Sequence, residues 1–390
     1  MQARDFGKTD KQVSILGFGV ARLPESRRNR FDLERGVPIL RRAFDLGVNY
    51  IDSAQAYGAG TSELAIGRAI QGYDRSKLFL TTKIPCHTEH LSRGAVWRKN
   101  LEVSLRRLDT PYIDFLFLHG IGWQAFADHI SRPRRALDAA RKAQVEGLIR
   151  HLCFSSHDTP ENIVRLIDAG EFDGMLVQYN CVDRHNEAAI AHAAARGVGV
   201  AIMGPLGAGM LAGLGNGAAL PGAPNASAPE LALQFVWSNP HVSVALSGMS
   251  SVEQVEHNTA AAERFTVMSL KERRRAERFF AARQKLSDQA CTYCGQCLPC
   301  PKRVNIPENF RALNWHRVWG LEASARQAYA RLNGRVRWEP WGKVGGRKAS
   351  ACNRCGECEP RCPYGIPIMA QLEEVAAALG DAPRRGGRRT

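Results

Sequence analysis

Residues 291–301 read CTYCGQCLPCP, and residues 352–363 repeat the pattern as CNRCGECEPRCP. The first run spaces its cysteines as C-x2-C-x2-C-x2-C-P and the second as C-x2-C-x2-C-x3-C-P, which gives Cys291, Cys294, Cys297, Cys300, Cys352, Cys355, Cys358 and Cys362. Three thiolates at two-residue gaps can surround one cubane, and the fourth cysteine, followed by proline, usually ligates the other cluster. The two runs therefore predict two [4Fe-4S] clusters, around which this part of the chain folds.

Zinc is the alternative ligand, because it also binds C-x2-C pairs. A zinc site needs only four ligands, however, and gives no reason for a third C-x2 step or a following proline. A disulfide framework is less consistent with the sequence, since the N-terminus MQARDFGKTDKQ is charged and has no apolar signal segment. No run of about 18 apolar residues predicts a membrane span. We therefore expect a cytoplasmic protein with reduced thiols.

The net charge of +15 is concentrated at the cysteine-rich end. Residues 271–390 hold 24 Lys and Arg against 11 Asp and Glu, whereas residues 1–270 hold 29 against 27. Two clusters with their thiolates would offset about 4 of these positive charges. The remaining positive charge either only keeps this part of the protein soluble or attracts an acidic electron-transfer protein as a partner. Nucleic acid is not an expected partner, because only the basic tail favours it.

The first 265 residues alternate short apolar runs with amphipathic stretches. The runs are LGFG at 16, NYID at 49, LFLTTK at 78, IDFLFLH at 113, IRHLCFSS at 149, GMLVQY at 174, VGVAIM at 198 and VSVALSG at 242. Eight strand–helix units, with strands too apolar to have a solvated face, indicate a parallel (β/α)8 TIM barrel. A doubly wound sheet is the alternative, but it requires a helix after the first Gly-rich turn, and GFGVARLP is not followed by one.

The composition along the chain predicts four segments. We expect the barrel over residues 1–265, a connecting helix over 266–290, a mainly helical two-cluster domain over 291–380 and a disordered basic tail over 381–390. Within the barrel, residues 5–15 predict a small hairpin at its floor. The segment 207–225, rich in Gly, Ala and Pro, predicts a long functional loop after the seventh strand.

Four reactive side chains, Asp52, Tyr57, Lys83 and His119, lie at or just after predicted strand ends, where barrel enzymes place their active sites. Here the chain resembles the aldo-keto reductases over residues 5 to about 265. The resemblance rests on the motifs GVNYIDSAQAYG, SELAIGRAI, TTKIP, YIDFLFLH, FSSH, VQYN, GPLGAGML and SGMSSVEQVEHN, which stand in the family's order. It implies a barrel enzyme that uses NAD(P)H to reduce a small carbonyl substrate to an alcohol, or the reverse.

The resemblance implies a role for each of the four side chains. Tyr57 would protonate the carbonyl oxygen as hydride reaches the carbon. A nearby Lys83 ammonium would lower the pKa of Tyr57, and Asp52 would keep that lysine charged and oriented. His119 would hydrogen-bond the carbonyl oxygen and fix its approach.

The resemblance also implies a cofactor site. Ser155, His157 and Gln178 take positions that hold the nicotinamide carboxamide, although an asparagine is common where His157 stands, and Met203 replaces a stacking aromatic residue. The expected pyrophosphate segment contains Pro205, Leu206 and Gly207, and the adenosine end contains Ser250, Ser251 and Asn258. Gly248 and Gln254 stand where many members carry basic residues for the 2′-phosphate. We therefore expect a modest preference for NADH, or none.

The cysteine-rich end resembles the ferredoxin-like domain appended to one branch of aldo-keto reductases, over about residues 288–378. The spacing favours one cubane on Cys291, Cys294, Cys297 and Cys362, and the other on Cys352, Cys355, Cys358 and Cys300. The gap before Cys300 is one residue shorter than the corresponding gap in the second run, so an arrangement in which each run holds its own cubane stays open. The remaining cysteines, Cys86, Cys153 and Cys181, are interpreted as ordinary barrel residues.

An alternative function follows from the electron count. A hydride carries two electrons together, whereas a cluster moves one, and a flavin normally mediates between them. The sequence has no flavin-binding signature. The alternative is therefore an iron–sulfur electron-transfer or redox-sensing protein whose barrel binds nucleotide without turnover. The four intact reactive side chains favour an enzyme.

Overall fold

The computed structural model describes residues 1–27, 30–181, 183–207, 227–274, 278, 297–317, 322–339, 342–362 and 365–380. These residues group into two compact units. The first contains residues 1–207 and 229–274, and the second contains residues 227–228, 278 and the described residues from 297 onward. Several predictions lie outside the described residues. They concern Cys291 and Cys294, nearly all of the loop 207–225, most of the connecting helix 266–290 and the tail 381–390.

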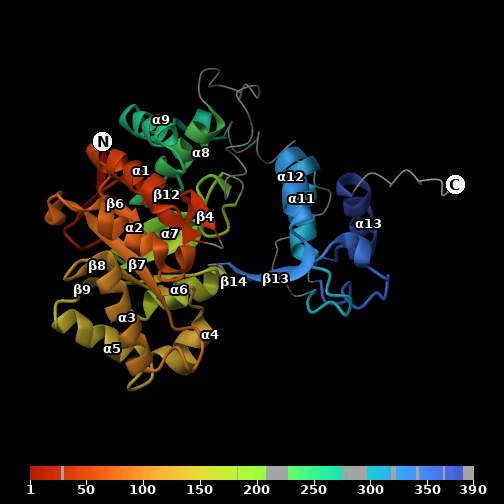
Figure 1. Cartoon of the computed structure of the whole chain (residues 1–390), viewed down its shortest axis with the longest axis horizontal. Coiled ribbons are helices and arrows are strands. Elements are labelled where there is room, and N and C mark those ends of the chain that lie inside the picture. The colour runs from red at the N-terminus through yellow and green to blue at the C-terminus, as the bar shows by residue number, and fades with distance from the viewer. Residues whose placement is uncertain are drawn as a thin grey trace. The chain divides into compact units, whose positions relative to one another are not determined.

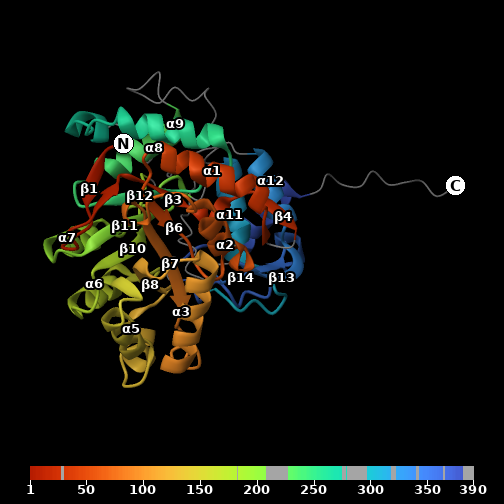
Figure 2. The same cartoon turned by 60° about the vertical axis from the view of Figure 1, so that its left-hand side comes forward.

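The first unit is a closed barrel of eight parallel strands, which confirms the predicted fold class (Figures 1 and 2). The barrel runs in chain order from β3 to β12, and β12 pairs with β3 to close it. All eight predicted runs form strands: β3 (Leu16–Gly19), β6 (Tyr50–Asp52), β7 (Phe79–Pro85), β8 (Ile113–His119), β9 (Ile149–Ser155), β10 (Gly174–Gln178), β11 (Gly199–Met203) and β12 (Val244–Ser247). Buried aromatic and aliphatic side chains, such as Tyr50, Phe115 and Phe117, pack together in one core cluster of this unit.

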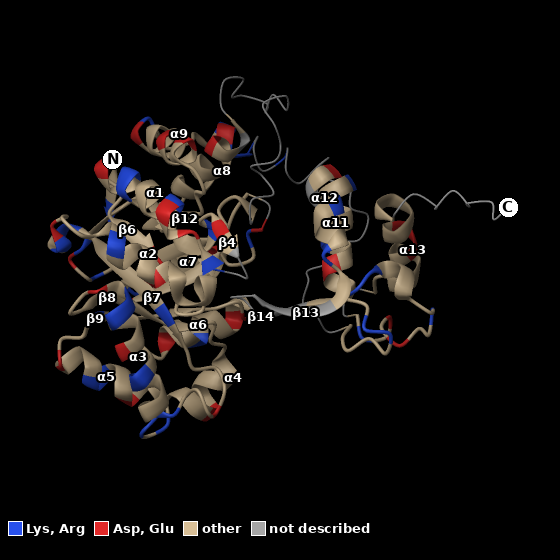
Figure 3. Ribbon diagram, viewed as in Figure 1, with Lys and Arg blue, Asp and Glu red and all other residues tan. Residues whose placement is uncertain are grey.

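Helices follow the strands and cover the outside of the barrel (Figure 1). They are α1 (Leu33–Asp45), α2 (Thr61–Ala69), α3 (Gly94–Leu108), α4 (Trp123–Ala125), α5 (Ala136–Val145), α6 (Pro160–Asp168), α7 (Glu187–Ala195), α8 (Ala228–Trp237) and α9 (Val252–Glu263). Charged side chains of both signs are spread over these helices, as the near-balanced charge of residues 1–270 requires (Figure 3). Among the described residues, no helix combines the length and the apolar composition needed to cross a membrane.

The hairpin predicted near the N-terminus forms between β1 (Ala3–Asp5) and β2 (Gln12–Ser14). Phe6 follows β1 and is fully buried against the first residues of β10 and β11. A Cβ added at Gly174 or Gly199 would come within 2.5 Å and 2.4 Å of the Phe6 ring. Both positions therefore need glycine, and the hairpin plugs the end of the barrel where these strands begin. The carboxyl ends of the strands are left for a site.

The second unit contains α11 (Ile306–Arg317), α12 (Glu322–Ala330), α13 (Ile368–Leu379) and an antiparallel hairpin, β13 (Asn333–Glu339) with β14 (Gly342–Arg347). Two of these helices, α11 and α12, lie between the cysteine runs, in agreement with the mainly helical domain that the sequence predicts. The hairpin was not predicted, although the sequence RVRWEPWGKV alternates apolar and polar residues before and after the turn-forming residues Pro and Gly. The small core of this unit packs Phe310, Leu313, Tyr329, Leu372 and Val375.

Candidate functional site

Strands β6 and β7 place Asp52 and Lys83 side by side inside the barrel, near the carboxyl ends of these strands. The Lys83 Nζ donates to both Asp52 carboxylate oxygens at 2.7 Å and to the Ser53 carbonyl at 2.6 Å. The Thr81 hydroxyl donates to the same carboxylate at 3.0 Å. Lys83 and Asp52 are only 1% and 4% exposed. An ammonium this deeply buried requires such a fully hydrogen-bonded partner.

Tyr57 faces this ion pair. Its ring centre lies 5.0 Å from the Lys83 Nζ, and the pKa values of the two groups depend on each other. Burial raises the pKa of Tyr57 above its ordinary value, and the Lys83 ammonium offsets only part of this rise. Burial also lowers the pKa of Lys83, but Asp52 and Tyr57 outweigh it and leave the pKa raised. Lys83 therefore lowers the pKa of Tyr57 as expected, but in the protein without ligands the effect of burial is larger.

His119 ends β8 and completes the group of four. Its ring centre lies 6.1 Å from that of Tyr57, with the two planes at 85°. Burial, together with the Lys83 ammonium and the rings of His157 and His87, lowers the pKa of His119 to about 3. The imidazole is therefore neutral at physiological pH and can donate one hydrogen bond to a carbonyl oxygen.

A left-handed turn carries Tyr57 to this position. In η2 (Tyr57–Gly60) the φ angles of Gly58 and Ala59 are 55° and 52°, and that of Gly60 is 89°. Two glycines take this conformation without steric cost, whereas Ala59 pays about 1 kcal/mol or more. The Thr61 hydroxyl donates to the Gly58 carbonyl at 2.6 Å and accepts from the Phe31 N–H at 2.8 Å. These contacts stabilise a turn that ordinary backbone preferences disfavour.

The residues predicted for the nicotinamide end lie at the ends of the next strands. Ser155 ends β9, is buried and accepts a 2.8 Å hydrogen bond from the Gly120 N–H, so its own proton can be donated. Gln178 ends β10 and donates through Nε2 to Asp183 at 2.8 Å, so its Oε1 can accept a hydrogen bond. Met203 ends β11 and is partly buried, while His157 is exposed in the loop after β9. These strand ends thus surround the same mouth of the barrel.

The residues predicted for the rest of the cofactor follow β11 and β12. Pro205, Leu206 and Gly207 form a turn in which the Gly207 N–H donates to the Gly204 carbonyl at 2.9 Å. Buried Asn180, which sequence reasoning did not select although it ends the VQYN motif, donates to the same carbonyl at 2.9 Å. At the other end Ser251 caps α9 and accepts from the Gln254 N–H. The remaining predicted residues of this end are Gly248, Ser250 and Asn258, whose amide donates to the Ser247 hydroxyl at 3.1 Å.

The three barrel cysteines Cys86, Cys153 and Cys181 are buried, and burial raises the pKa of each thiol. A thiol with a raised pKa is a weak nucleophile. Burial therefore disfavours the reactive thiolate at each of the three, which supports the structural role expected for them.

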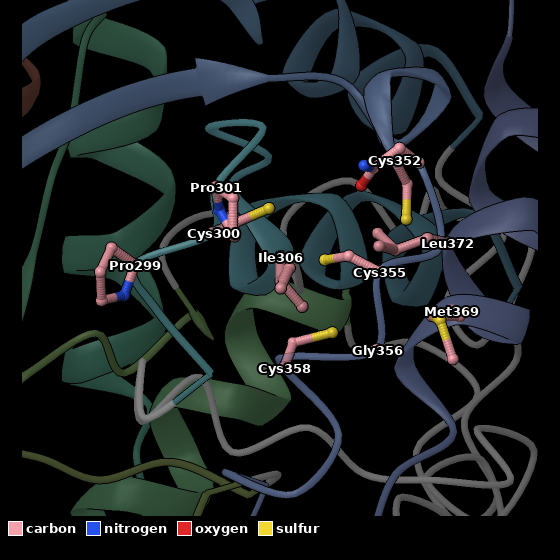
Figure 4. A pocket seen from close by; sticks show the side chains of 11 residues that line it. Pro299, Cys300, Pro301, Ile306, Cys352, Cys355, Gly356, Cys358, Met369 and Leu372 are labelled. Carbon is pink, nitrogen blue, oxygen red and sulfur yellow. The ribbon is translucent and has the colours of Figure 1, made fainter.

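In the second unit a pocket brings together cysteines from both runs. Cys300 of the first run lines it with Cys352, Cys355 and Cys358 of the second. Their sulfur atoms point toward a common space, bordered by apolar side chains that include Ile306, Met369 and Leu372 (Figure 4). Burial raises the pKa of Cys358, and the nearby thiols of Cys352 and Cys300 raise it further. The backbone N–H of Arg354 points at the Cys352 sulfur, 3.4 Å away.

The pocket fits a cluster better than a single ion. It is partly open to solvent, and its four thiols come from two separate runs of the chain. Within the described parts of the chain, no three Cys, His, Asp or Glu side chains converge closely enough to hold one metal ion. A zinc site would need four such groups around one centre. Cys297 and Cys362 belong to the same core but do not line this pocket.

Two family models match the chain. The aldo/keto reductase family matches residues 15–223, and the 4Fe-4S dicluster domain matches residues 290–367. L-galactose dehydrogenase of Arabidopsis thaliana is 28% identical over 67% of this chain and 88% of its own length. The NADH-specific methylglyoxal reductase of Escherichia coli is 24% identical over 67% of this chain and 93% of its own length.

Solved structures match the barrel. The aldo-keto reductase AKR11C1 from Bacillus halodurans, in its holo form, superimposes with a TM-score of 0.61 at 29% identity, covering 71% of this chain and 96% of that chain. An aldo/keto reductase from Klebsiella pneumoniae in complex with NADP and acetate gives a TM-score of 0.58 at 27% identity, covering 70% of this chain and 94% of that chain.

Proposed function

The chain belongs to the aldo/keto reductase family and carries a C-terminal 4Fe-4S dicluster domain, and from this premise we propose that it is a nicotinamide-dependent oxidoreductase that interconverts a small carbonyl compound and its alcohol. The observation that carries this proposal is the buried Lys83–Asp52 pair, with Tyr57 and His119 beside it. A merely structural ion pair would not need a phenol and a neutral imidazole beside it at the carboxyl ends of the strands.

Each of the four side chains has a separate role in carbonyl reduction. Bound reduced nicotinamide supplies the hydride, which goes to the carbonyl carbon. The Tyr57 hydroxyl gives its proton to the carbonyl oxygen, and the Lys83 ammonium stabilises the phenolate that remains. The neutral His119 ring donates a hydrogen bond to the same oxygen and directs the carbonyl toward the barrel mouth. Asp52 holds Lys83 in place throughout, and solvent later returns a proton to Tyr57.

The barrel mouth suits a nicotinamide nucleotide. Ser155 can donate and Gln178 can accept, and both belong to neighbouring strands, as recognition of a carboxamide requires. Gly248 has no side chain to crowd the adenosine end. Similar proteins use either nucleotide: the reductase of Escherichia coli is named NADH-specific, and the structure from Klebsiella pneumoniae contains NADP.

The dicluster domain would hold two [4Fe-4S] clusters for electron transfer or redox control. The pocket of Cys300, Cys352, Cys355 and Cys358 supports the crossed arrangement, in which the last cysteine of the first run ligates the cluster of the second. By the same pattern Cys362 would complete the site of Cys291, Cys294 and Cys297. An acidic electron-transfer protein suits the positive charge of this end of the chain as a partner.

An anaerobic screen of carbonyl and alcohol substrates, followed by nicotinamide absorbance, tests the enzyme assignment. Turnover that disappears in a Tyr57→Phe variant would support it. Stopped-flow mixing with NADH under argon tests the alternative. Clusters reduced in the absence of any carbonyl, with no turnover of any substrate, would identify an electron-transfer protein instead.

A further inference from the structure

A buried carboxylate lies next to the proposed catalytic groups but touches none of them. Glu63 belongs to the first turn of α2 and has no exposed surface. Its Oε1 accepts a 2.7 Å hydrogen bond from the hydroxyl of Thr82, the residue before Lys83 in β7. Its Oε2 accepts from Arg107 Nη1 at 3.3 Å, in an ion pair whose arginine side chain is 31% exposed. One carboxylate thus connects α2 to the strand of Lys83 and to the end of α3.

The arginine of this pair packs on the turn that carries Tyr57. A Cβ added at Gly60 would lie 2.5 Å from both Cζ and Nη1 of Arg107, so the guanidinium rests directly on the Gly60 backbone. Gly60 closes η2 and has a φ of 89°, which already favours glycine. The close approach of Arg107 is a second reason for glycine at this position, and it supports the turn on the side of α3.

We propose that Glu63 and Arg107 are positioning residues, which hold the Tyr57–Gly60 turn against the Lys83 strand so that the phenol meets the ammonium. This role rests on the proposed function, because it matters only if Tyr57 transfers a proton. The turn places three successive residues at positive φ, so its conformation is not maintained by local preferences. The Glu63–Arg107 pair connects both sides of the Tyr57–Lys83 contact, the turn and the strand, to one rigid element, α2.

The charged and titratable groups that face Tyr57 come from four elements. They are Lys83 on β7, Asp52 on β6, His119 on β8 and Arg22 on η1 (Val20–Arg22). Neither Glu63 nor Arg107 is among them. A change in the titration of Tyr57 caused by either residue would therefore report a displaced phenol or ammonium, rather than a lost direct charge interaction.

The experiment compares Glu63→Gln and Arg107→Lys with a matched control, Asp114→Asn. Asp114 is also buried, pairs with Arg75 at 2.7 Å and accepts from the Leu80 N–H, but it lies near the start of β8, away from the site. Glutamine keeps the shape of Glu63 and its contact with Thr82, while lysine keeps the charge of Arg107 but cannot lie flat on Gly60. Glu63→Gln and Asp114→Asn each remove the charge of a buried carboxylate that is paired with an arginine, so their losses in Tm should be comparable, whereas Arg107→Lys keeps its charge and should lose less.

Two readouts separate positioning from stability. The first is the ultraviolet titration of Tyr57, taken as the difference between each protein and the same protein carrying Tyr57→Phe. We expect it to move to higher pH in Glu63→Gln and Arg107→Lys and to stay unchanged in Asp114→Asn. The second is kinetic, with kcat lowered about tenfold and KM changed by less than about twofold in the first two variants only. If Glu63→Gln does not fold, the Tyr57 titration and the kinetics of Arg107→Lys alone test the inference.

The titration is independent of any substrate. If the wild-type protein turns over no carbonyl compound, the proposed function fails, and the titration still decides whether the pair positions Tyr57. An unchanged Tyr57 titration and an unchanged kcat in stable Glu63→Gln and Arg107→Lys proteins would overturn the inference and reduce the pair to a stabilising contact.

Discussion

Arg22 and Gly248 share one space at the end of the barrel where the adenosine of a nicotinamide nucleotide would lie. A Cβ added at Gly248 would come within 2.5 Å of the Arg22 Cγ and 2.8 Å of its Cβ. The stem of Arg22 therefore covers the position from which many family members extend a basic side chain. Gly248 cannot gain such a side chain unless Arg22 moves.

This relationship sharpens the prediction about the nucleotide. We expect NADH to bind as tightly as NADPH or more tightly, because Gly248 and Gln254 provide no cation for the 2′-phosphate. Fluorescence titration of the anaerobic protein with both nucleotides measures the two Kd values. A Kd for NADPH more than about tenfold below that for NADH, about 1.4 kcal/mol, would contradict the prediction. Loss of that preference in Arg22→Ala would then identify Arg22 as the cation.

Tyr57→Phe should lower kcat at least about a hundredfold while the Kd for nicotinamide changes little. The phenol contributes its proton only when charge develops on the carbonyl oxygen, and the phenylalanine ring fills the same space beside Lys83. Steady-state kinetics and nucleotide titration on the same preparation check both parts. Near-normal turnover would remove Tyr57 from the mechanism.

His119 should make the stability of the protein depend on pH in a definite direction. Its pKa of about 3 in the folded protein lies below the ordinary value of 6.5, so between these values the unfolded chain binds more protons and stability falls as pH falls. We expect the free energy of unfolding of the wild type to decline more steeply than that of His119→Gln between about pH 7 and about pH 5. Urea unfolding at several pH values measures this decline for both proteins. An equal decline in the free energy of unfolding would show that His119 protonates in the folded protein as easily as in the unfolded chain.

Cys300→Ala should disturb the cluster of the second run rather than that of the first. Anaerobic wild-type protein should contain about eight iron and eight sulfide per chain. In the variant, the EPR signal that is also lost in Cys355→Ala should disappear or change, because Cys300 shares its pocket with Cys355. Cys86→Ala, which removes a buried barrel thiol, serves as the control. Loss of only the other signal would mean that each run holds its own cubane.

The barrel was predictable from sequence because each parallel strand is buried on both faces and forms an apolar run ended by turn residues. The same reasoning placed Asp52, Lys83 and His119, since strand ends of a barrel converge on one mouth. Helix boundaries were less certain. Thr159 caps α6, although Asp158 just before it is an equally common capping residue, because the Asp158 carboxylate accepts from the Trp123 N–H.

Contacts between distant segments could not be predicted. No sequence pattern shows that Arg107 lies on Gly60 or that Glu63 reaches Thr82, because these pairs depend on how α2 and α3 pack. The net direction of the Tyr57 pKa shift could not be predicted for a related reason. The sequence indicates the charge of Lys83 but not the extent of burial, and burial is the larger of the two opposing effects.

The positions of the pocket cysteines in the sequence determine when during synthesis this pocket can form. It takes one sulfur from residue 300 and three from residues 352–358, with the hairpin and two helices in between. A ribosome has therefore released all eight barrel strands, which end at Ser247, well before the last of these sulfurs emerges. If this pocket binds a cluster, iron would be needed only after the barrel strands have been synthesised, and we would expect a cell short of iron to accumulate chains with a complete barrel and an unassembled C-terminal end.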